Sequence, residues 1–158
     1  MKLSTRSRYG LRMLLDMAQH SGDGPVQIGS IAKRQDISVK YLEQLIIPLK
    51  KANYIRSIRG PKGGHLLARS PDEITVGEIV DLLEGGVSLA SCIEQPGICD
   101  RHGDCVTRAI WEEATRAMHE RLDVITLAEM MKRTVRESVG GKPKKATGAI
   151  RKRRPRKP

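Results

Sequence analysis

Residues 38–64 read SVKYLEQLIIPLKKANYIRSIRGPKGG, a helical repeat followed by a glycine-rich hairpin. Apolar residues three or four positions apart predict one buried side of a helix over residues 39–52, with Ser38 as its N-cap. Pro48 lies inside that pattern and should bend the helix, because proline removes one backbone hydrogen bond. Residues 54–58 alternate between apolar and polar side chains, residues 60–64 turn, and residues 65–68 return, which predicts a two-stranded hairpin.

Two further helices are predicted upstream of this stretch. The first begins near Ser4 or Thr5 and ends before the breaker run at residues 21–25, and the second covers residues 28–34. Residues 35–37 form a tight turn before the third helix. Three short helices followed by a hairpin are the layout of a winged helix-turn-helix, so the sequence predicts a mostly α fold with a small β-hairpin wing.

Downstream of the hairpin, Thr75 and Glu78 form a capping box for a short helix that ends at Gly85 and Gly86. A loop at residues 91–104 then precedes a long helix at residues 106–122, and Thr126 caps a last short helix. We therefore expect a winged helix domain in residues 1–84, a cysteine loop in residues 85–105, two helices in residues 106–137 and a disordered basic tail in residues 138–158.

The net charge of +11 belongs mostly to that tail. Nine of the 29 Lys and Arg residues lie in residues 140–158, which leaves 20 against 18 acidic residues in the rest of the 158-residue chain. The remaining basic residues gather before residue 70, which favours one polyanion-binding face. Aromatic residues make up only 3%, which disfavours base stacking on single-stranded nucleic acid. Without a signal peptide or a membrane span, we expect a soluble, cytoplasmic protein that contacts no membrane.

The third predicted helix exposes hydrogen-bonding side chains near its start, where a helix can meet base edges in the major groove. These side chains belong to Ser38, Lys40, Glu43 and Gln44, and Tyr41 is shared between core and surface. The hairpin tip carries Arg56, Arg59 and Lys62, and an Arg on a narrow tip can enter a minor groove. The same pattern also fits a small α+β domain whose charges form an ordinary solvated face.

Three cysteines, Cys92, Cys99 and Cys105, have the spacing C-x6-C-x5-C within one loop. Their odd number and the cytosolic setting argue against structural disulfides. Convergent thiolates suit an iron–sulfur cluster, zinc or copper(I), although the spacing is not that of zinc ribbons. Thiol redox chemistry and incidental loop cysteines remain open as alternatives.

Several side chains could supply a fourth ligand to such a centre. Asp100, His102 and Asp104 lie inside the loop, and Glu94 can reach it. His119 follows Cys105 by 14 residues, which is about 21 Å along a continuous helix, too far within one subunit. We therefore expect His119 to be a surface side chain.

Taken together, these features resemble the IscR-like family of bacterial transcriptional regulators over roughly residues 1–135. The resemblance rests on Met1-Lys2-Leu3-Ser4, Arg8-Tyr9, Tyr41-Leu42-Glu43-Gln44-Leu45, Ile58-Arg59-Gly60-Pro61-Lys62-Gly63-Gly64, Val76-Gly77-Glu78-Ile79, the three cysteines and Ala109-Ile110-Trp111. It implies a homodimeric winged-helix regulator of palindromic double-stranded DNA operators, which we expect to be a repressor. The helix at residues 106–122 would be its dimerisation helix.

The resemblance also implies functional residues. Major-groove contacts would come from Ser38, Lys40, Tyr41, Glu43 and Gln44, and a minor-groove contact from Arg59. Cys92, Cys99 and Cys105 would ligate a [2Fe–2S] cluster whose presence or redox state changes operator affinity.

One departure concerns the fourth cluster ligand. The best-known members have a His three residues after the third Cys, where this chain has Arg108, which cannot ligate a metal. Other members use an acidic residue of the partner's first helix, and the matching position here is Arg8. Either another group such as His102, Asp104, solvent or a thiol completes the site, or the nuclearity differs, or the cluster is lost and the cysteines sense oxidants directly.

Three other classes compete with this interpretation. A winged-helix regulator without a cofactor could respond to a small ligand or a partner protein. An architectural or RNA-associated basic protein is disfavoured by the near-neutral body of the chain. We predict that the chain is not an enzyme, because it has no phosphate-binding loop leading into a helix, no His–carboxylate constellation and no nucleophile motif.

Overall fold

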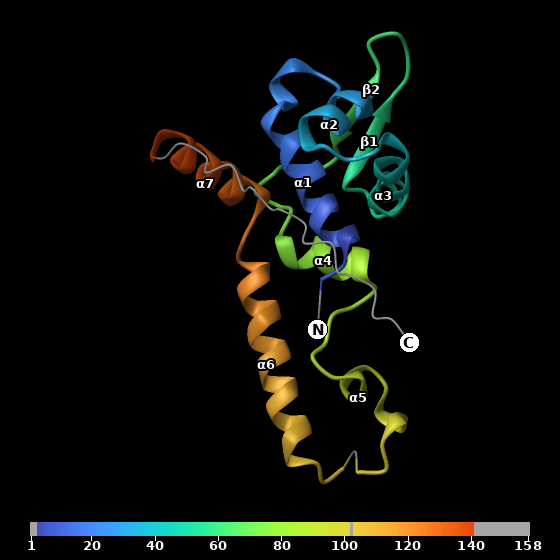
Figure 1. The fold of residues 1–158 in the computed structure, drawn as a ribbon, viewed down its shortest axis with the longest axis vertical. Coiled ribbons are helices and arrows are strands. Elements are labelled where there is room, and N and C mark those ends of the chain that lie inside the picture. The colour runs from blue at the N-terminus through green and yellow to red at the C-terminus, as the bar shows by residue number, and fades with distance from the viewer. Residues whose placement is uncertain (1–2, 102, 141–158) are drawn as a thin grey trace, which may run out of the picture.

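The computed structural model describes residues 3–101 and 103–140 (Figure 1). In chain order the elements are α1 (Thr5–Gln19), the 3-10 turn η1 (Ser21–Asp23), α2 (Ile28–Gln35), α3 (Val39–Lys51), β1 (Ile55–Ile58), β2 (Gly64–Leu67), α4 (Val76–Glu84), α5 (Ser91–Glu94), the 3-10 turn η2 (Pro96–Ile98), α6 (Val106–Asp123) and α7 (Leu127–Gly140). The predicted mostly α fold with a hairpin wing is confirmed. Figure 1 also shows α6 extending away from the helices around α1, with the α5 segment beside it.

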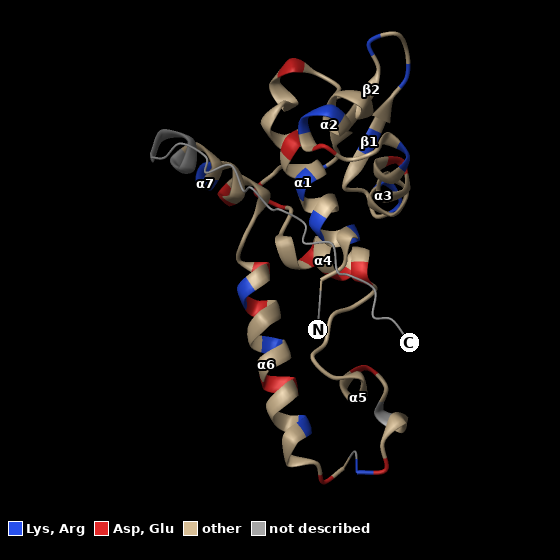
Figure 2. Cartoon of the chain, in the orientation of Figure 1, with Lys and Arg blue, Asp and Glu red and all other residues tan. Residues whose placement is uncertain are grey.

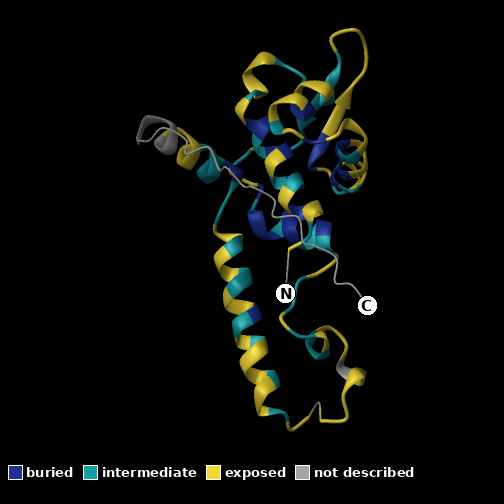
Figure 3. Ribbon diagram, in the orientation of Figure 1, coloured by how far each residue is buried: buried dark blue, intermediate teal, exposed yellow. Residues whose placement is uncertain are grey.

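The hydrophobic core is built around α1. Met13, Leu14 and Met17 of this helix are almost fully buried against apolar side chains of α3, α4 and α7. Figure 3 shows the buried residues concentrated around α1–α4, whereas α6 is mostly exposed or half-buried. The close packing of α1 on α4 requires a glycine, because a Cβ at Gly10 would overlap Leu83 Cδ1.

The helix-turn-helix forms through local capping signals that the sequence predicted. The Ser4 hydroxyl accepts a hydrogen bond from the Arg6 N–H and caps α1. The α2 helix ends at Asp36, whose φ of 53° places it in the left-handed region, and the chain then reverses into α3. Ser38 caps α3 by accepting from the Tyr41 N–H at 3.2 Å. As predicted, Pro48 lies inside α3.

The wing is a two-stranded antiparallel sheet that is anchored to the chain before α2. Its register pairs Ile55 with Leu67 and Ile58 with Gly64. His65 also exchanges two backbone hydrogen bonds of 2.9 Å with Val26. A Cβ at Gly64 would lie 2.7 Å from the Val26 carbonyl oxygen, so only glycine allows this approach. The wing is therefore fixed relative to the start of α2 by backbone contacts.

Downstream of the wing, two predictions were wrong. The predicted loop at residues 91–104 contains the short helices α5 and η2, which few sequence signals announce. The last helix is not short, because Leu127 is buried in the core and α7 packs along α1. Residues 138–140 of the predicted tail consequently belong to α7, whereas residues 141–158 and His102 lie outside the described residues. Among the helices of the described ranges, none is long and apolar enough to cross a membrane.

Candidate nucleic-acid interface and cysteine loop

The start of α3 presents the polar side chains that the sequence assigned to DNA contact. Ser38, Lys40, Glu43 and Gln44 are exposed, while Leu42 and Leu45 on the opposite side of the helix are buried. The helix is thus held by its apolar side and leaves its polar side free for a ligand. A row of donors and acceptors of this kind can hydrogen-bond to base edges and phosphates.

Tyr41 differs from these residues because it is half-buried and bound to α1. Its hydroxyl lies 2.9 Å from the Thr5 hydroxyl, and its ring packs edge-on against Tyr9 with centroids 5.8 Å apart. The Arg12 guanidinium lies 5.5 Å from the centroid of the Tyr9 ring. Tyr41 therefore fixes the start of α3 to α1 as well as bordering the exposed surface.

The wing adds positive charge beside α3. Arg56, Arg59 and Lys62 are exposed, and none of the ion pairs found within the described ranges involves them. Figure 2 shows these basic residues on the wing and further ones on α1, α2 and α3. Arg59 and Lys62 lie in the turn, whereas Arg56, predicted at the tip, lies within β1 opposite Leu66. Free cationic side chains on a hairpin are suited to phosphate and groove contacts.

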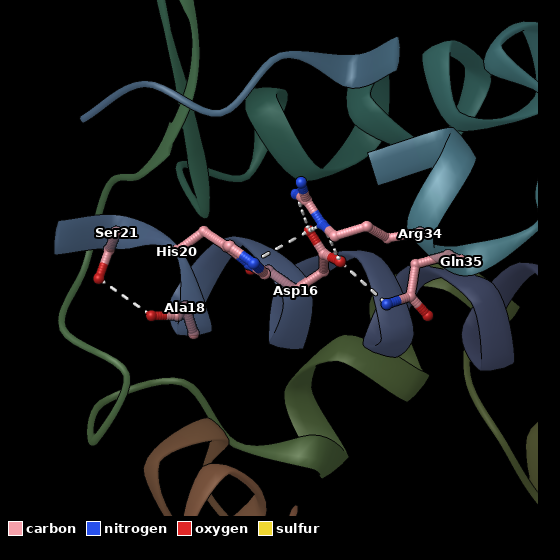
Figure 4. A network of polar contacts seen from close by, with 6 residues as sticks. All are labelled: Asp16, Ala18, His20, Ser21, Arg34 and Gln35. Carbon is pink, nitrogen blue, oxygen red and sulfur yellow. Dashed lines mark hydrogen bonds and ion pairs between the residues drawn. The ribbon is translucent and has the colours of Figure 1, made fainter. Parts of the chain in front are cut away.

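A buried carboxylate, which the sequence did not reveal, fixes α2 against α1 (Figure 4). The Asp16 residue is 1% exposed, and its oxygens accept hydrogen bonds from Arg34 Nη2 at 2.6 Å, Arg34 Nε at 3.0 Å and Gln35 Nε2 at 2.9 Å. Burial alone would raise the pKa of Asp16, but the hydrogen bonds from Arg34 and Gln35 and the charge of Arg34 hold this pKa below its ordinary value. Because Arg34 and Gln35 precede the turn into α3, this contact sets where the helix-turn-helix reverses.

The three cysteines are free and lie at different points of one segment. Cys92 belongs to α5, Cys99 follows η2, and Cys105 occupies the N-cap position of α6. Within residues 3–101 and 103–140, no three His, Cys, Asp or Glu side chains lie close enough together to hold a metal ion. The segment would have to close further before the thiols could share one centre.

Cys105 has the most distinctive chemistry of the three thiols. Its Sγ lies 3.1 Å from the Thr107 hydroxyl, and hydrogen bonds from that hydroxyl and from the Arg108 N–H lower the pKa of Cys105. A lowered pKa raises the fraction of thiolate, which is the reactive form of cysteine.

We expect Cys105 to react with iodoacetamide about threefold faster than Cys99 near pH 7, although Cys99 is the more exposed. Timed quenching followed by peptide mass spectrometry measures the two rates. Thr107→Val should remove the advantage of Cys105, and Thr107→Ser should retain it. Equal rates in the unmodified chain would contradict the effect of Thr107.

The residues at the possible fourth-ligand positions differ in whether they are bonded to other groups. Arg108, at the position where a His would complete the site, forms an ion pair with Glu112 at 2.6 Å and donates to the Cys92 carbonyl oxygen at 3.4 Å. Glu94 accepts a hydrogen bond of 2.6 Å from Ser88, and Arg8 is exposed on α1. Asp100 and Asp104 are exposed in the segment, and His102 lies outside the described residues.

His119 is not the surface side chain that we expected, because its side chain is only 26% exposed. Its Nε2 lies 2.7 Å from the Val87 carbonyl oxygen, and its Nδ1 lies 3.4 Å from Asp81 Oδ2. His119 thus contacts both α4 and the segment that follows α4.

The long helix α6 has two different faces. Val106 and Ile110 are well exposed one turn apart on its outer face, and the C-cap residue Val124 is exposed in line with them at the other end. Met118 and Leu122 are half-buried on the inner face. An exposed apolar stripe on a long helix is typical of a helix that packs against another chain.

Comparison with known proteins identifies similar chains of nearly the same length. The family model described as "Rrf2: Iron-dependent Transcriptional regulator" matches residues 3–133. Protein rrf2 of Nitratidesulfovibrio vulgaris is 51% identical over 132 residues, covering 84% of this chain and 88% of that protein. The solved structure of T. potens IscR has a TM-score of 0.72 at 40% identity and covers 91% of this chain and 94% of its own. CymR, the global cysteine regulator of B. subtilis, has a TM-score of 0.73 at 36% identity and covers 84% and 98%.

Proposed function

This chain belongs to the Rrf2 family of transcriptional regulators, and from that premise we propose a homodimeric repressor that reads a palindromic operator and senses its signal through the cysteine segment. Membership confirms the resemblance to IscR-like regulators. Because the relatives are transcriptional regulators, it also confirms that the chain is not an enzyme. The proposal rests above all on the exposed polar side of α3 beside the basic wing.

The proposed DNA contacts divide between two grooves. Ser38, Lys40, Tyr41, Glu43 and Gln44 would face the major groove, and Arg59 would enter the adjacent minor groove. Support comes from the exposure of all these residues except Tyr41, which is half-buried. Its contact with Thr5 assigns Tyr41 a positioning role in addition to any DNA contact.

The test begins with an operator selected from a random duplex library and footprinted on both strands. We expect a palindromic footprint with half-sites about one helical turn apart, because both recognition helices must reach one face of the DNA. Arg59→Ala should weaken operator binding about tenfold or more, while Lys132→Ala, which removes an equal charge from α7, should leave it nearly unchanged. A footprint without two-fold symmetry would overturn the proposal.

Gly63→Ala should reduce operator affinity about as much as Arg59→Ala while removing no DNA-contacting group. A Cβ at Gly63 would overlap the Ile58 carbonyl oxygen and lie 2.8 Å from the Gly60 carbonyl oxygen, so the wing turn must change shape. The melting temperature should change little, because the tip is exposed. Gly97→Ala, where no atom lies within 4 Å of the added Cβ, serves as the matched control. Equal operator affinity of Gly63→Ala and the unmodified protein would contradict the role of the wing.

The proposed functional division follows the fold. Residues 1–84 would form the winged helix domain, residues 85–105 the sensor segment, and residues 106–140 the dimerisation helix and C-terminal helix. The remaining basic residues of the predicted tail, 141–158, lie outside the described residues. The exposed apolar stripe of Val106, Ile110 and Val124 supports a partner helix packed on α6.

For the sensor we propose a [2Fe–2S] cluster on Cys92, Cys99 and Cys105. The chemistry of three free thiols fits such a cluster, whereas their present separation requires the segment to close around it. When bound, the cluster would supply a redox-sensitive charged centre between α5 and α6. Arg108 cannot be its fourth ligand, since a guanidinium has no acceptor and this one is paired with Glu112.

Anaerobic purification tests this proposal through the visible absorption spectrum and through iron and sulfide counts per chain. We expect a coloured protein that loses iron, sulfide and colour in the triple variant Cys92→Ala, Cys99→Ala, Cys105→Ala. A colourless protein after chemical reconstitution would remove the cluster. Direct oxidation of thiols would then be the sensing chemistry, an alternative favoured by the lowered pKa of Cys105.

A further inference from the structure

Side chains of α6 make three contacts with the backbone of residues 87–92, which lead from α4 into α5. His119 Nε2 lies 2.7 Å from the Val87 carbonyl oxygen. The Leu89 N–H donates to the Thr115 hydroxyl at 3.2 Å, and Arg108 Nε donates to the Cys92 carbonyl oxygen at 3.4 Å. We call these three contacts the α6 ladder.

The α6 ladder shows how the segment runs beside α6. On α6, Arg108, Thr115 and His119 are seven and four positions apart, so they lie on one side of the helix. On the other side of the ladder the chain passes Val87 and Leu89, bends at residues 89–90 and enters α5, where Arg108 reaches the Cys92 carbonyl oxygen. The contacts occur in opposite chain order on the two sides, so residues 87–92 and α6 run antiparallel.

The α6 ladder ends at the cysteines on one side and at the winged helix domain on the other. At the first end, Arg108 contacts the backbone of Cys92 itself. At the second end, His119 Nδ1 lies 3.4 Å from Asp81 Oδ2 on α4, and the Asp81 carbonyl oxygen accepts from the Gly85 and Gly86 N–H groups. Asp81 Oδ1 is buried and has no hydrogen-bond partner among the described residues, so Oδ2, beside His119, is the oxygen of this carboxylate that makes a side-chain contact.

The helix α4 is in turn firmly attached to α1. Its last residue, Glu84, accepts hydrogen bonds from the Ser4 N–H at 3.1 Å and the Ser4 hydroxyl at 2.9 Å, and it also bonds the Ser7 hydroxyl. A displacement of α4 would therefore reach the helix that positions α2 and α3.

Without the α6 ladder, a movement of the cysteine segment would hardly displace α4, because the chain between them contains two adjacent glycines. Gly85 and Gly86 have φ values of 80° and 99°, and nothing lies within 4 Å of where a side chain would begin. Apart from their two backbone hydrogen bonds to Asp81, no side chain restrains these glycines, so the chain can change direction here at low cost. Movement at the cysteines would be absorbed there unless residues 87–89 were held in place.

We propose that Thr115 and His119 are positioning residues that couple the cysteine segment to the winged helix domain. They hold residues 87–89 against α6, so that a change at Cys92 displaces α4 instead of being absorbed at Gly85 and Gly86. This inference rests on the proposed function, because it requires both operator binding and a sensing role for the cysteines.

The test compares operator affinity before and after carboxymethylation of the cysteines with iodoacetate, with modification verified by mass spectrometry. In the unmodified sequence we expect carboxymethylation to change the affinity at least about fivefold. In Thr115→Val and in His119→Ala, carboxymethylation should leave operator affinity almost unchanged. Before carboxymethylation, the affinity of each variant should lie within about threefold of that of the protein without substitutions. Thr115→Ser keeps the hydroxyl, so its operator affinity should respond to carboxymethylation as in the protein without substitutions. Arg116→Ala, on the exposed side of α6, should also keep this response.

Amide hydrogen exchange provides a second measurement that does not depend on DNA. In the protein without substitutions, carboxymethylation should change the hydrogen-exchange rates of peptides from α4. In Thr115→Val, where the Leu89 N–H has lost its acceptor, these rates should stay the same. If carboxymethylation leaves operator affinity of the unmodified sequence unchanged, the sensing role of the cysteines is wrong. If carboxymethylation changes operator affinity by the same factor with and without the Thr115→Val or His119→Ala substitution, the sensing role of the cysteines is retained. In that case the coupling through the α6 ladder is wrong.

Discussion

Ile110→Glu will convert the protein to monomers and weaken operator binding about a thousandfold, toward the level of nonspecific DNA. Ile110 is 53% exposed in the second turn of α6, and Val106, one turn earlier, is 77% exposed. A carboxylate at this position would be buried without a partner in the proposed dimer interface, which is strongly unfavourable. A monomer contacts one half-site only and loses the contribution of the second recognition helix.

Size-exclusion chromatography with light scattering measures the mass of each variant, and fluorescence anisotropy with a labelled operator measures its affinity. Lys132→Glu is the matched control, since it places the same acidic side chain on an exposed position of α7. Circular dichroism should show that both variants keep the helical fold. A dimeric Ile110→Glu protein with full operator affinity would show that this stripe is not the dimer interface.

Arg34→Ala will lower the free energy of unfolding by about 3 kcal/mol, because it leaves the Asp16 carboxylate buried without its charged partner. For a chain of this size the melting temperature should fall by roughly 10 °C. Gln35 still donates one hydrogen bond to Asp16, so the decrease in the free energy of unfolding should be smaller than for a buried carboxylate with no partner at all. Adding Asp16→Asn to Arg34→Ala should recover part of the stability, since a neutral amide is less costly to bury.

Urea titration measures these differences, and Lys33→Ala removes a neighbouring exposed base as a control. The pH dependence provides a further check. The pKa of Asp16 is lower in the folded than in the unfolded chain, so its contribution is present above about pH 4 and is lost as the pH falls through the folded value. The difference in the free energy of unfolding between the unmodified protein and Arg34→Ala should therefore become smaller at acidic pH. A constant difference would assign the loss to packing by Arg34 rather than to its charge.

Local signals explain how much of the fold could be predicted from the sequence. Ser38 and Thr75 predict the starts of two helices because their side chains cap them, and the glycines at residues 60–64 predict the wing turn. Each of these signals acts within a few residues, where sequence and structure are directly linked. The α5 and η2 turns carry no comparable signal, and the length of α7 depends on the burial of Leu127 against distant residues.

The parts of the candidate site that escaped prediction depend on residues far apart in the chain. Asp16 lies between Met13 and Met17 in an apolar stripe, and a charged residue there was a signal of a buried partner. The sequence could not name Arg34 as that partner. In the same way His119 was expected on the surface, because its contact with Val87 spans 32 residues and depends on how α6 packs.

The pairing of β2 with Val26 bears on how operator preference can diverge among related regulators. Two backbone hydrogen bonds set the distance between the wing and the helix-turn-helix, and no side chain takes part in them. Residues at the wing tip can therefore be exchanged during evolution without altering the span between the two elements. Two glycines are exceptions: a larger residue at Gly64 would push the wing away from Val26, and one at Gly63 would change the shape of the turn. The fold thus fixes the position of the wing through backbone hydrogen bonds and leaves the side chains at its tip to contact DNA.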